Sequence, residues 1–173
     1  VYRVPLPGAH RKKDPSVRRL TKGEFNFTNV MFAPDYRHFT VLCSNVSTPV
    51  RSLLYSVDKG LIRQLGDSRG DAYALELEKG NIPVSEVHFI TTEDGFTIPA
   101  IVTWPLNREK GKKYPVLVSV YGGPDNGSVT DRWVSPASRY HWARKGVIQI
   151  TLDHRGSGHC GKRGHFPDGR SEE

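Results

Sequence analysis

The first third of the chain consists of short β-prone runs with turn-forming residues between them, and the run at residues 25–32 begins with alternating apolar and polar residues. Alternation with a period of two is typical of β-strands that bury one face. Short strands with turn residues between them favour an antiparallel meander. We therefore expect residues 1–65 to form four strands, about one blade of a β-propeller, at residues 1–6, 25–32, 38–44 and 51–57.

The pattern changes between residues 66 and 83. The run Ala72 to Glu78 is rich in Ala, Leu and Glu, which favour helix, and Gly80 follows as a stop signal. We interpret residues 66–83 as a short linking helix between two structural units.

A second unit is expected to begin near Val84. Residues 87–91 and 96–104 flank an Asp-Gly pair and predict a hairpin. Residues 114–120 are almost continuously apolar, which indicates a strand buried on both faces, as in a parallel sheet. A helix is expected over residues 135–145, with Ser135 as its N-cap, and another buried strand over 147–152. This order is the start of an α/β sandwich.

The composition is low in apolar residues for a chain of 173 residues, with 36% hydrophobic residues and a mean hydropathy of -0.51. Together with the absence of an initial Met and the abrupt acidic end, this suggests a piece of a larger protein. No run is long enough to span a membrane, so no membrane segment is expected in this chain. Its compartment cannot be read from the sequence.

The net charge is +7, but the basic residues lie in scattered clusters beside Gly, Pro and Asp. Solvated turns explain them better than a nucleic-acid surface, so no nucleic-acid partner is predicted. Cys43 falls in an apolar strand and is expected to be buried. The seven His show no metal-binding spacing, so neither a metal nor a cofactor is predicted.

Two segments that directly follow buried strands carry the candidate chemistry. Tyr121-Gly122-Gly123-Pro124 ends the first of these strands, where two glycines permit a sharp turn and a close approach of the backbone to a ligand. The Tyr121 hydroxyl could there face developing negative charge, although an ordinary turn explains the tetrapeptide equally well. The second segment, residues 153–159, reads DHRGSGH and lies at the sheet edge where α/β folds bind ligands.

Three other interpretations of the second segment are weaker. Residues 156–161 satisfy GxGxxG, but they do not follow the strand directly and no helix-forming run comes after them. Ser157 lacks the G-x-S-x-G context of a nucleophile elbow. Asp153 and His154 resemble part of a catalytic triad, but neighbouring residues at a strand end point in different directions.

Taken in order, several stretches resemble the dipeptidyl peptidase IV branch of the prolyl oligopeptidase family. They cover nearly the whole chain, and the ordered set is more specific than any single motif. These stretches are YRVPL, FAPDYRHFTV, LIRQL, TTEDGFTIPAIVTWP, KKYPVLVSVYGGP and DHRGSG.

The resemblance implies a mixed fold: the last antiparallel blade of a β-propeller over residues 1–65, the linker at 66–83, and the N-terminal part of an α/β-hydrolase domain over 84–173. It also implies a serine peptidase that removes dipeptides from the N-terminus of short peptides. Tyr121 matches the family's oxyanion hydroxyl donor. The supporting active-site loops would be formed by Gly122, Gly123, Pro124, Asp153, Arg155 and Gly156.

The family's Ser nucleophile, the Asp and His of its triad, and its Glu pair for the substrate amino terminus have no match in this chain, so we expect the chain alone to be inactive. The implied partners are a peptide substrate, the rest of the parent chain and a homodimer mate. The implied compartments are the periplasm, the extracellular space or a membrane-anchored location. His154 and the His159-Cys160 pair depart from the family's usual loop residues.

Two alternatives remain open. The chain could belong to a catalytically inactive, peptidase-like binding module that keeps the Tyr121 turn. It could also belong to a non-peptidase hydrolase such as an esterase, although a blade preceding the hydrolase domain argues against this.

Overall fold

The computed structural model describes residues 1–4, 17–161 and 164, and the chain divides into two compact units, Val1–Gly70 and Asp71–Glu173. Parts of the predicted first strand and of the basic clusters lie outside the described residues. Within those residues, no helix is both long and apolar enough to cross a membrane.

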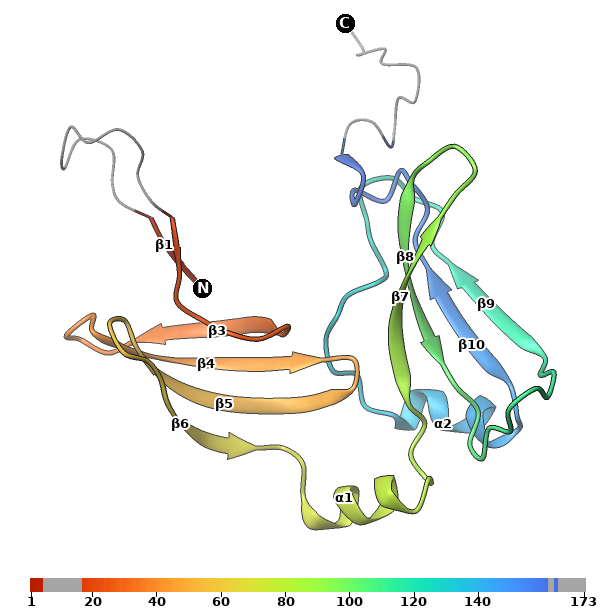
Figure 1. Cartoon of the computed structure of the whole chain (residues 1–173), viewed down its shortest axis with the longest axis horizontal. Helices are drawn as coiled ribbons and strands as arrows, with labels where there is room; N and C mark the ends of the chain where they lie inside the picture. The colour runs from red at the N-terminus through yellow and green to blue at the C-terminus, as the bar shows by residue number, and fades with distance from the viewer. Residues whose placement is uncertain (5–16, 162–163, 165–173) are drawn as a thin grey trace, which may run out of the picture. The chain divides into compact units, whose positions relative to one another are not determined.

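The first unit is built on a four-stranded antiparallel meander, which Figure 1 shows in orange to yellow. The predicted strands at 25–32, 38–44 and 51–57 are confirmed. The sheet runs in the order β3 (Asn26–Phe32), β4 (His38–Asn45), β5 (Thr48–Ser56) and β6 (Gly60–Asp67).

The fourth strand of this sheet is not the one that the sequence predicted. The start of the chain forms β1 (Tyr2–Arg3), which pairs with β2 (Arg18–Arg19) in a separate two-stranded sheet. β6 completes the meander instead. The register of β6 against β5 shifts twice, and most of its residues are exposed. Because neither face of β6 is consistently buried, its sequence lacks the alternation that marks a strand.

One face of the meander carries the core of this unit. Along β4, buried residues alternate with partly buried ones. Phe39 stacks on Tyr55 of β5, with ring centroids 5.3 Å apart. Cys43 is buried, as expected, and the burial raises the pKa of its thiol. The buried cluster consists of Leu20, Phe39, Val41, Cys43, Leu53 and Tyr55.

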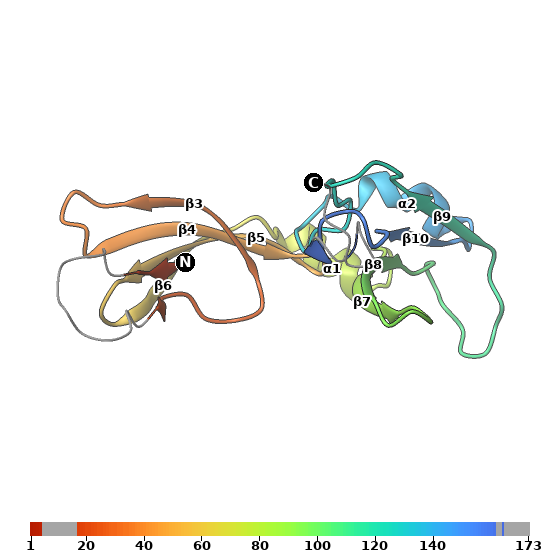
Figure 2. The same ribbon diagram turned by 90° about the horizontal axis from the view of Figure 1, so that it is seen from above.

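The second unit is a mixed four-stranded sheet with the order β7-β8-β10-β9. The predicted hairpin and the two later strands are present, and β9 and β10 pair in parallel, as expected. α2 lies beside β10 (Figure 2). The Gln149 side chain donates a hydrogen bond to the Arg139 carbonyl at 2.9 Å. The elements are α1 (Asp71–Glu78), β7 (Ser85–Thr91), β8 (Thr97–Thr103), β9 (Val116–Val120), α2 (Ala137–Arg144) and β10 (Ile148–Leu152).

Two local predictions in this unit are wrong. All five residues of β9 are exposed, and those of β10 are only partly buried, although both runs were predicted to be buried. β9 lies at the end of the strand order, with β10 as its neighbour, so it has apolar residues on a sheet edge. The N-cap of α2 is Pro136 rather than Ser135, and it makes no side-chain cap hydrogen bond.

Candidate active-site loops

The two candidate segments lie at the same edge of the second sheet. β9 and β10 are parallel, and their last residues, Val120 and Leu152, are paired in register. Tyr121 and Asp153 are therefore the first residues beyond a matched pair of strand ends. The sheet geometry accordingly brings together the loop after β9, residues 121–136, and the loop after β10, residues 153–161.

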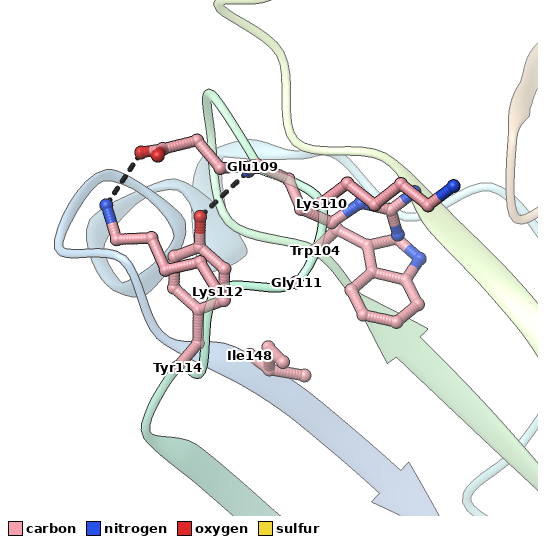
Figure 3. Close-up of a pocket in the computed structure, with 8 residues that line it drawn as sticks. Trp104, Glu109, Lys110, Gly111, Lys112, Tyr114 and Ile148 are labelled. Carbon is pink, nitrogen blue, oxygen red and sulfur yellow. Dashed lines mark hydrogen bonds and ion pairs between the residues drawn. The ribbon is translucent and has the colours of Figure 1, made fainter.

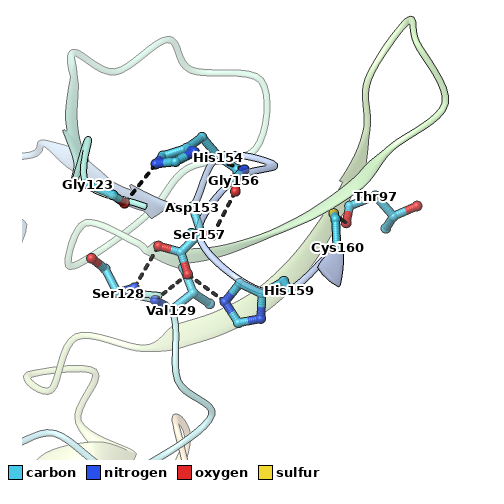
Figure 4. A network of polar contacts seen from close by, with 10 residues as sticks. All are labelled: Thr97, Gly123, Ser128, Val129, Asp153, His154, Gly156, Ser157, His159 and Cys160. Carbon is cyan, nitrogen blue, oxygen red and sulfur yellow. Dashed lines mark hydrogen bonds and ion pairs between the residues drawn. The ribbon is translucent and has the colours of Figure 1, made fainter. Parts of the chain in front are cut away.

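Asp153 is fully buried, with 0% of its surface exposed, and it joins the two loops. Its carboxylate accepts the backbone N–H groups of Ser128 at 2.7 Å and Val129 at 2.9 Å (Figure 4). Nε2 of His159 lies 2.7 Å from Oδ2 of Asp153. A buried carboxylate is costly unless such donors surround it, so these contacts fix the path of the loop after β9.

The electrostatics of Asp153 follow from this arrangement. Burial alone raises the pKa of the carboxyl, because desolvation penalises its charged form. The hydrogen bonds from Val129, Ser128 and His159 outweigh that effect, and the pKa lies below its ordinary value. Asp153 is therefore an ionised anchor at neutral pH.

Tyr121 contrasts with this anchor because 49% of its surface is exposed. Its ring lies over Gly123: a Cβ atom at Gly123 would stand 2.6 Å from Cε1 and 2.9 Å from the hydroxyl oxygen of Tyr121. Gly123 is thus needed for the close approach of the Tyr121 ring. At Gly122, by contrast, a Cβ would meet no atom within 4 Å. Pro124 follows in an exposed turn.

Two further contacts tie the loops together near Tyr121. The backbone N–H of Asp125 donates to the carbonyl of Gly156 at 3.0 Å. Nε2 of His154 lies 3.3 Å from the carbonyl oxygen of Gly123, and Nδ1 of His154 accepts the N–H of Gly156 at 3.0 Å (Figure 4). Asp153 and His154 therefore contact different partners.

Arg155 connects the loop after β10 to a third segment. Its guanidinium forms an ion pair with Asp94, in the turn between β7 and β8, and lies 5.7 Å from the ring centroid of Phe96. Both charged partners of this pair are about half exposed. Arg155 thus points along the sheet edge toward the hairpin, whereas Asp153 points toward the loop after β9.

The geometry of the second loop agrees with the rejection of Ser157 as a nucleophile. Ser157 is 3% exposed, and its hydroxyl donates to the carbonyl of His154 at 2.7 Å, so its oxygen is engaged inside the loop. The parts that sequence reasoning missed are the two backbone donors, the His159 contact and the His154 contact. Backbone N–H groups leave no signal in a sequence, although the unusual His154 and His159 did mark the loop.

A separate pocket lies at the other end of the same strands. It is lined by Tyr114, which lies just before β9, and by Ile148, which is the first residue of β10 (Figure 3). The Tyr114 hydroxyl accepts the backbone N–H of Glu109 at 2.9 Å, and the Arg108 guanidinium lies 4.3 Å from the ring centroid of Trp104. Because ligands of open α/β sheets bind at the carboxyl ends of the strands, we do not include this pocket in the candidate site.

Comparison with known proteins gives a consistent set of relatives in sequence. A probable dipeptidyl-aminopeptidase B of Ajellomyces dermatitidis is 38% identical over 79 residues, 46% of this chain. The protein of the same name from Aspergillus oryzae is 26% identical over 164 residues, 94% of this chain. The chain spans 9% and 17% of the length of these two proteins. No family model matches the chain.

A solved structure shares the fold. The crystal structure of Porphyromonas gingivalis dipeptidyl peptidase 4 matches with a TM-score of 0.65 and 23% sequence identity, over 81% of this chain and 20% of that chain. The expected mixed fold, a blade-like antiparallel sheet followed by the start of an α/β-hydrolase domain, is confirmed. The sequence relatives and the shared fold together support the assignment of this chain to the dipeptidyl peptidase IV branch of the prolyl oligopeptidase family.

Proposed function

We propose that this chain is a segment of a serine-type dipeptidyl peptidase and that it contributes Tyr121 as a hydroxyl donor to the oxyanion of the transition state. In this proposal, the Ser nucleophile and the Asp and His of the triad come from other parts of the full-length protein. The loops that hold Tyr121 would be formed by Gly122, Gly123, Pro124, Asp153, Arg155 and Gly156.

The observation that carries the proposal is the position of Tyr121. It is the first residue after a parallel strand, at the sheet edge where α/β folds bind their ligands, and about half of its surface is exposed. Its ring rests on Gly123, and buried Asp153 anchors the same loop. An oxyanion donor must be held in place before the charge develops, and this arrangement meets that requirement.

The chemistry would follow the ordinary course of acyl transfer. A serine hydroxyl attacks the scissile carbonyl carbon while a histidine removes its proton, and the carbonyl oxygen becomes negatively charged. The Tyr121 hydroxyl would donate a hydrogen bond to that oxygen. The histidine then gives that proton to the amine, which leaves as the tetrahedral intermediate collapses to the acyl-enzyme. Water, deprotonated by the same histidine, attacks the acyl carbon and releases the dipeptide, and the proton returns to the serine oxygen.

A fluorophosphonate probe combined with a chromogenic dipeptide substrate tests this proposal. We expect the full-length protein to be labelled and to release the dipeptide from a substrate with a free amino terminus. A substrate with a blocked amino terminus should be turned over much more slowly. If the full-length protein were neither labelled nor active, the result would instead indicate a peptidase-like binding module.

The 173-residue chain provides the matched control. We expect no labelling and no turnover from it, because the reacting groups would be supplied from elsewhere. Labelling of the isolated chain at a serine would contradict the proposed division of the active site.

A further inference from the structure

His154 bridges the two active-site loops with both of its ring nitrogens. Nδ1 lies 3.0 Å from the backbone nitrogen of Gly156, within its own loop, and Nε2 lies 3.3 Å from the carbonyl oxygen of Gly123, in the loop that carries Tyr121 (Figure 4). His154 is partly buried.

These two partners determine the tautomer of the ring. A backbone N–H can only donate, so Nδ1 must accept and carries no proton. In a neutral imidazole the proton then resides on Nε2, which faces a carbonyl oxygen that can only accept. His154 is therefore a neutral bridge: it receives a hydrogen bond from its own loop and donates one to Gly123.

The residue that receives this bond is the one beneath the Tyr121 ring. A Cβ at Gly123 would overlap both the ring and the hydroxyl of Tyr121, so a displacement of Gly123 changes the space in which Tyr121 sits. The bond from the Asp125 N–H to the Gly156 carbonyl, at 3.0 Å, links the same two loops on the far side of the turn. The loop after β10 thus holds residues 123 and 125 of the loop after β9, the first through the His154 side chain and the second through this backbone bond.

We propose that His154 is a positioning residue for Tyr121 and that it acts by holding the Gly123 carbonyl. The inference rests on the proposed oxyanion role of Tyr121 and adds to it: the family resemblance assigns no role to this position, where the His is itself a departure from the usual loop. Because the hydroxyl acts on the transition state, a displaced Tyr121 lowers kcat and leaves KM nearly unchanged.

Three substitutions in the full-length protein separate the two hydrogen bonds. His154→Gln keeps a side-chain N–H donor near the position of Nε2, and His154→Asn keeps an acceptor near the position of Nδ1. His154→Ala removes both. Melting temperatures of the Gln and Asn variants, which both retain a polar amide, show whether the comparison is made at equal stability.

If His154 acts through Gly123, kcat falls about tenfold in the Ala variant, as expected for one hydrogen bond. The Gln variant should recover most of this loss, and the Asn variant little of it, with KM within about twofold of the unmodified protein throughout. A better recovery by Asn than by Gln would overturn the proposal, since the internal bond to Gly156 would then be the important one. An unchanged kcat in the Ala variant would overturn it as well.

The same measurements in a Tyr121→Phe background distinguish this inference from the proposed function. If both are correct, Tyr121→Phe lowers kcat strongly, and His154→Ala adds little to that loss, because the hydroxyl to be positioned is gone. Additive losses would refute the positioning role and leave the oxyanion role intact. A Tyr121→Phe variant with unchanged kcat would refute the oxyanion role itself, whatever the effect of His154.

Discussion

Two carboxylates of this chain, Asp35 and Asp153, accept nearly the same set of hydrogen bonds in different surroundings. Asp35 accepts the backbone N–H groups of Arg37 at 2.9 Å and His38 at 3.3 Å, and the His38 ring lies 3.0 Å away. Asp153 likewise accepts two backbone N–H groups and contacts one His ring. The side chain of Asp35 is 49% exposed, whereas that of Asp153 is fully buried.

The difference lies in what each carboxylate holds together. The partners of Asp35 are two and three residues away, so it shapes a local turn between β3 and β4. The backbone partners of Asp153 are 24 and 25 residues away, in another loop, and burial prevents water from replacing the carboxylate. Equal hydrogen bonds can therefore have unequal weight, and the buried set fixes the edge of the sheet that carries the candidate site.

Removal of the carboxylate should show this difference most strongly. We expect Asp153→Ala to lower the local stability of the second unit by about 3–5 kcal/mol, because two inward-facing N–H groups lose their acceptor and a charge-assisted contact is lost. Hydrogen exchange of residues 116–135 in the full-length protein measures the effect. Asp35→Ala is the matched control and should leave exchange in its own unit nearly unchanged, because water can reach the freed donors.

A small steric change at Gly127 should give the next largest effect. A Cβ at this residue would lie 2.6 Å from Nε2 of His159 and 3.0 Å from Oδ2 of Asp153. We expect Gly127→Ala to separate His159 from Asp153 at a cost of about 1–3 kcal/mol, as for other overpacked sites. Gly70→Ala, where a Cβ meets nothing within 4 Å, is the control in the same exchange experiment. Equal exchange in the two variants would show that this contact is easily rearranged.

The pH dependence of stability should also separate the two carboxylates. The pKa of each is lowered, that of Asp35 chiefly by the Arg37 backbone N–H, and that of Asp153 despite burial. A lowered pKa in the folded state stabilises the fold above the ordinary Asp range, and this stabilisation is lost as pH falls through the folded-state value. The protection factors of residues 116–135, which correct exchange for its intrinsic dependence on pH, should therefore fall in acid, and Asp153→Asn should reduce this acid dependence far more than Asp35→Asn.

Much of this arrangement could be predicted from the sequence, because it follows from local patterns. Short β-prone runs between turn residues located β4 and β5, and the apolar runs that end just before Tyr121 and Asp153 located both loops at a sheet edge. The exposure of β9 was not predicted, because a run of apolar residues states a preference for burial and not what covers it. The partners of Asp153 could not be predicted either, since they are backbone groups that only the fold brings near.

Arg155 should show the smallest effect. Its ion pair with Asp94 is about half exposed, and exposed pairs contribute little to stability. We expect Arg155→Gln to leave the melting temperature of the full-length protein nearly unchanged and to lower kcat less than any substitution at Asp153. A loss as large as that of Asp153→Ala would mean that the hairpin turn, rather than the loop after β9, is the main support of the site.

The most direct test of the central claim is the steady-state kinetics of Tyr121→Phe in the full-length protein, measured with the chromogenic dipeptide substrate. The substitution keeps the ring over Gly123 and removes only the hydroxyl. We predict that kcat falls about 10²- to 10³-fold, the usual effect of removing one oxyanion donor, while KM changes little. An unchanged kcat, or a loss confined to KM, would contradict the claim that this chain supplies the oxyanion donor.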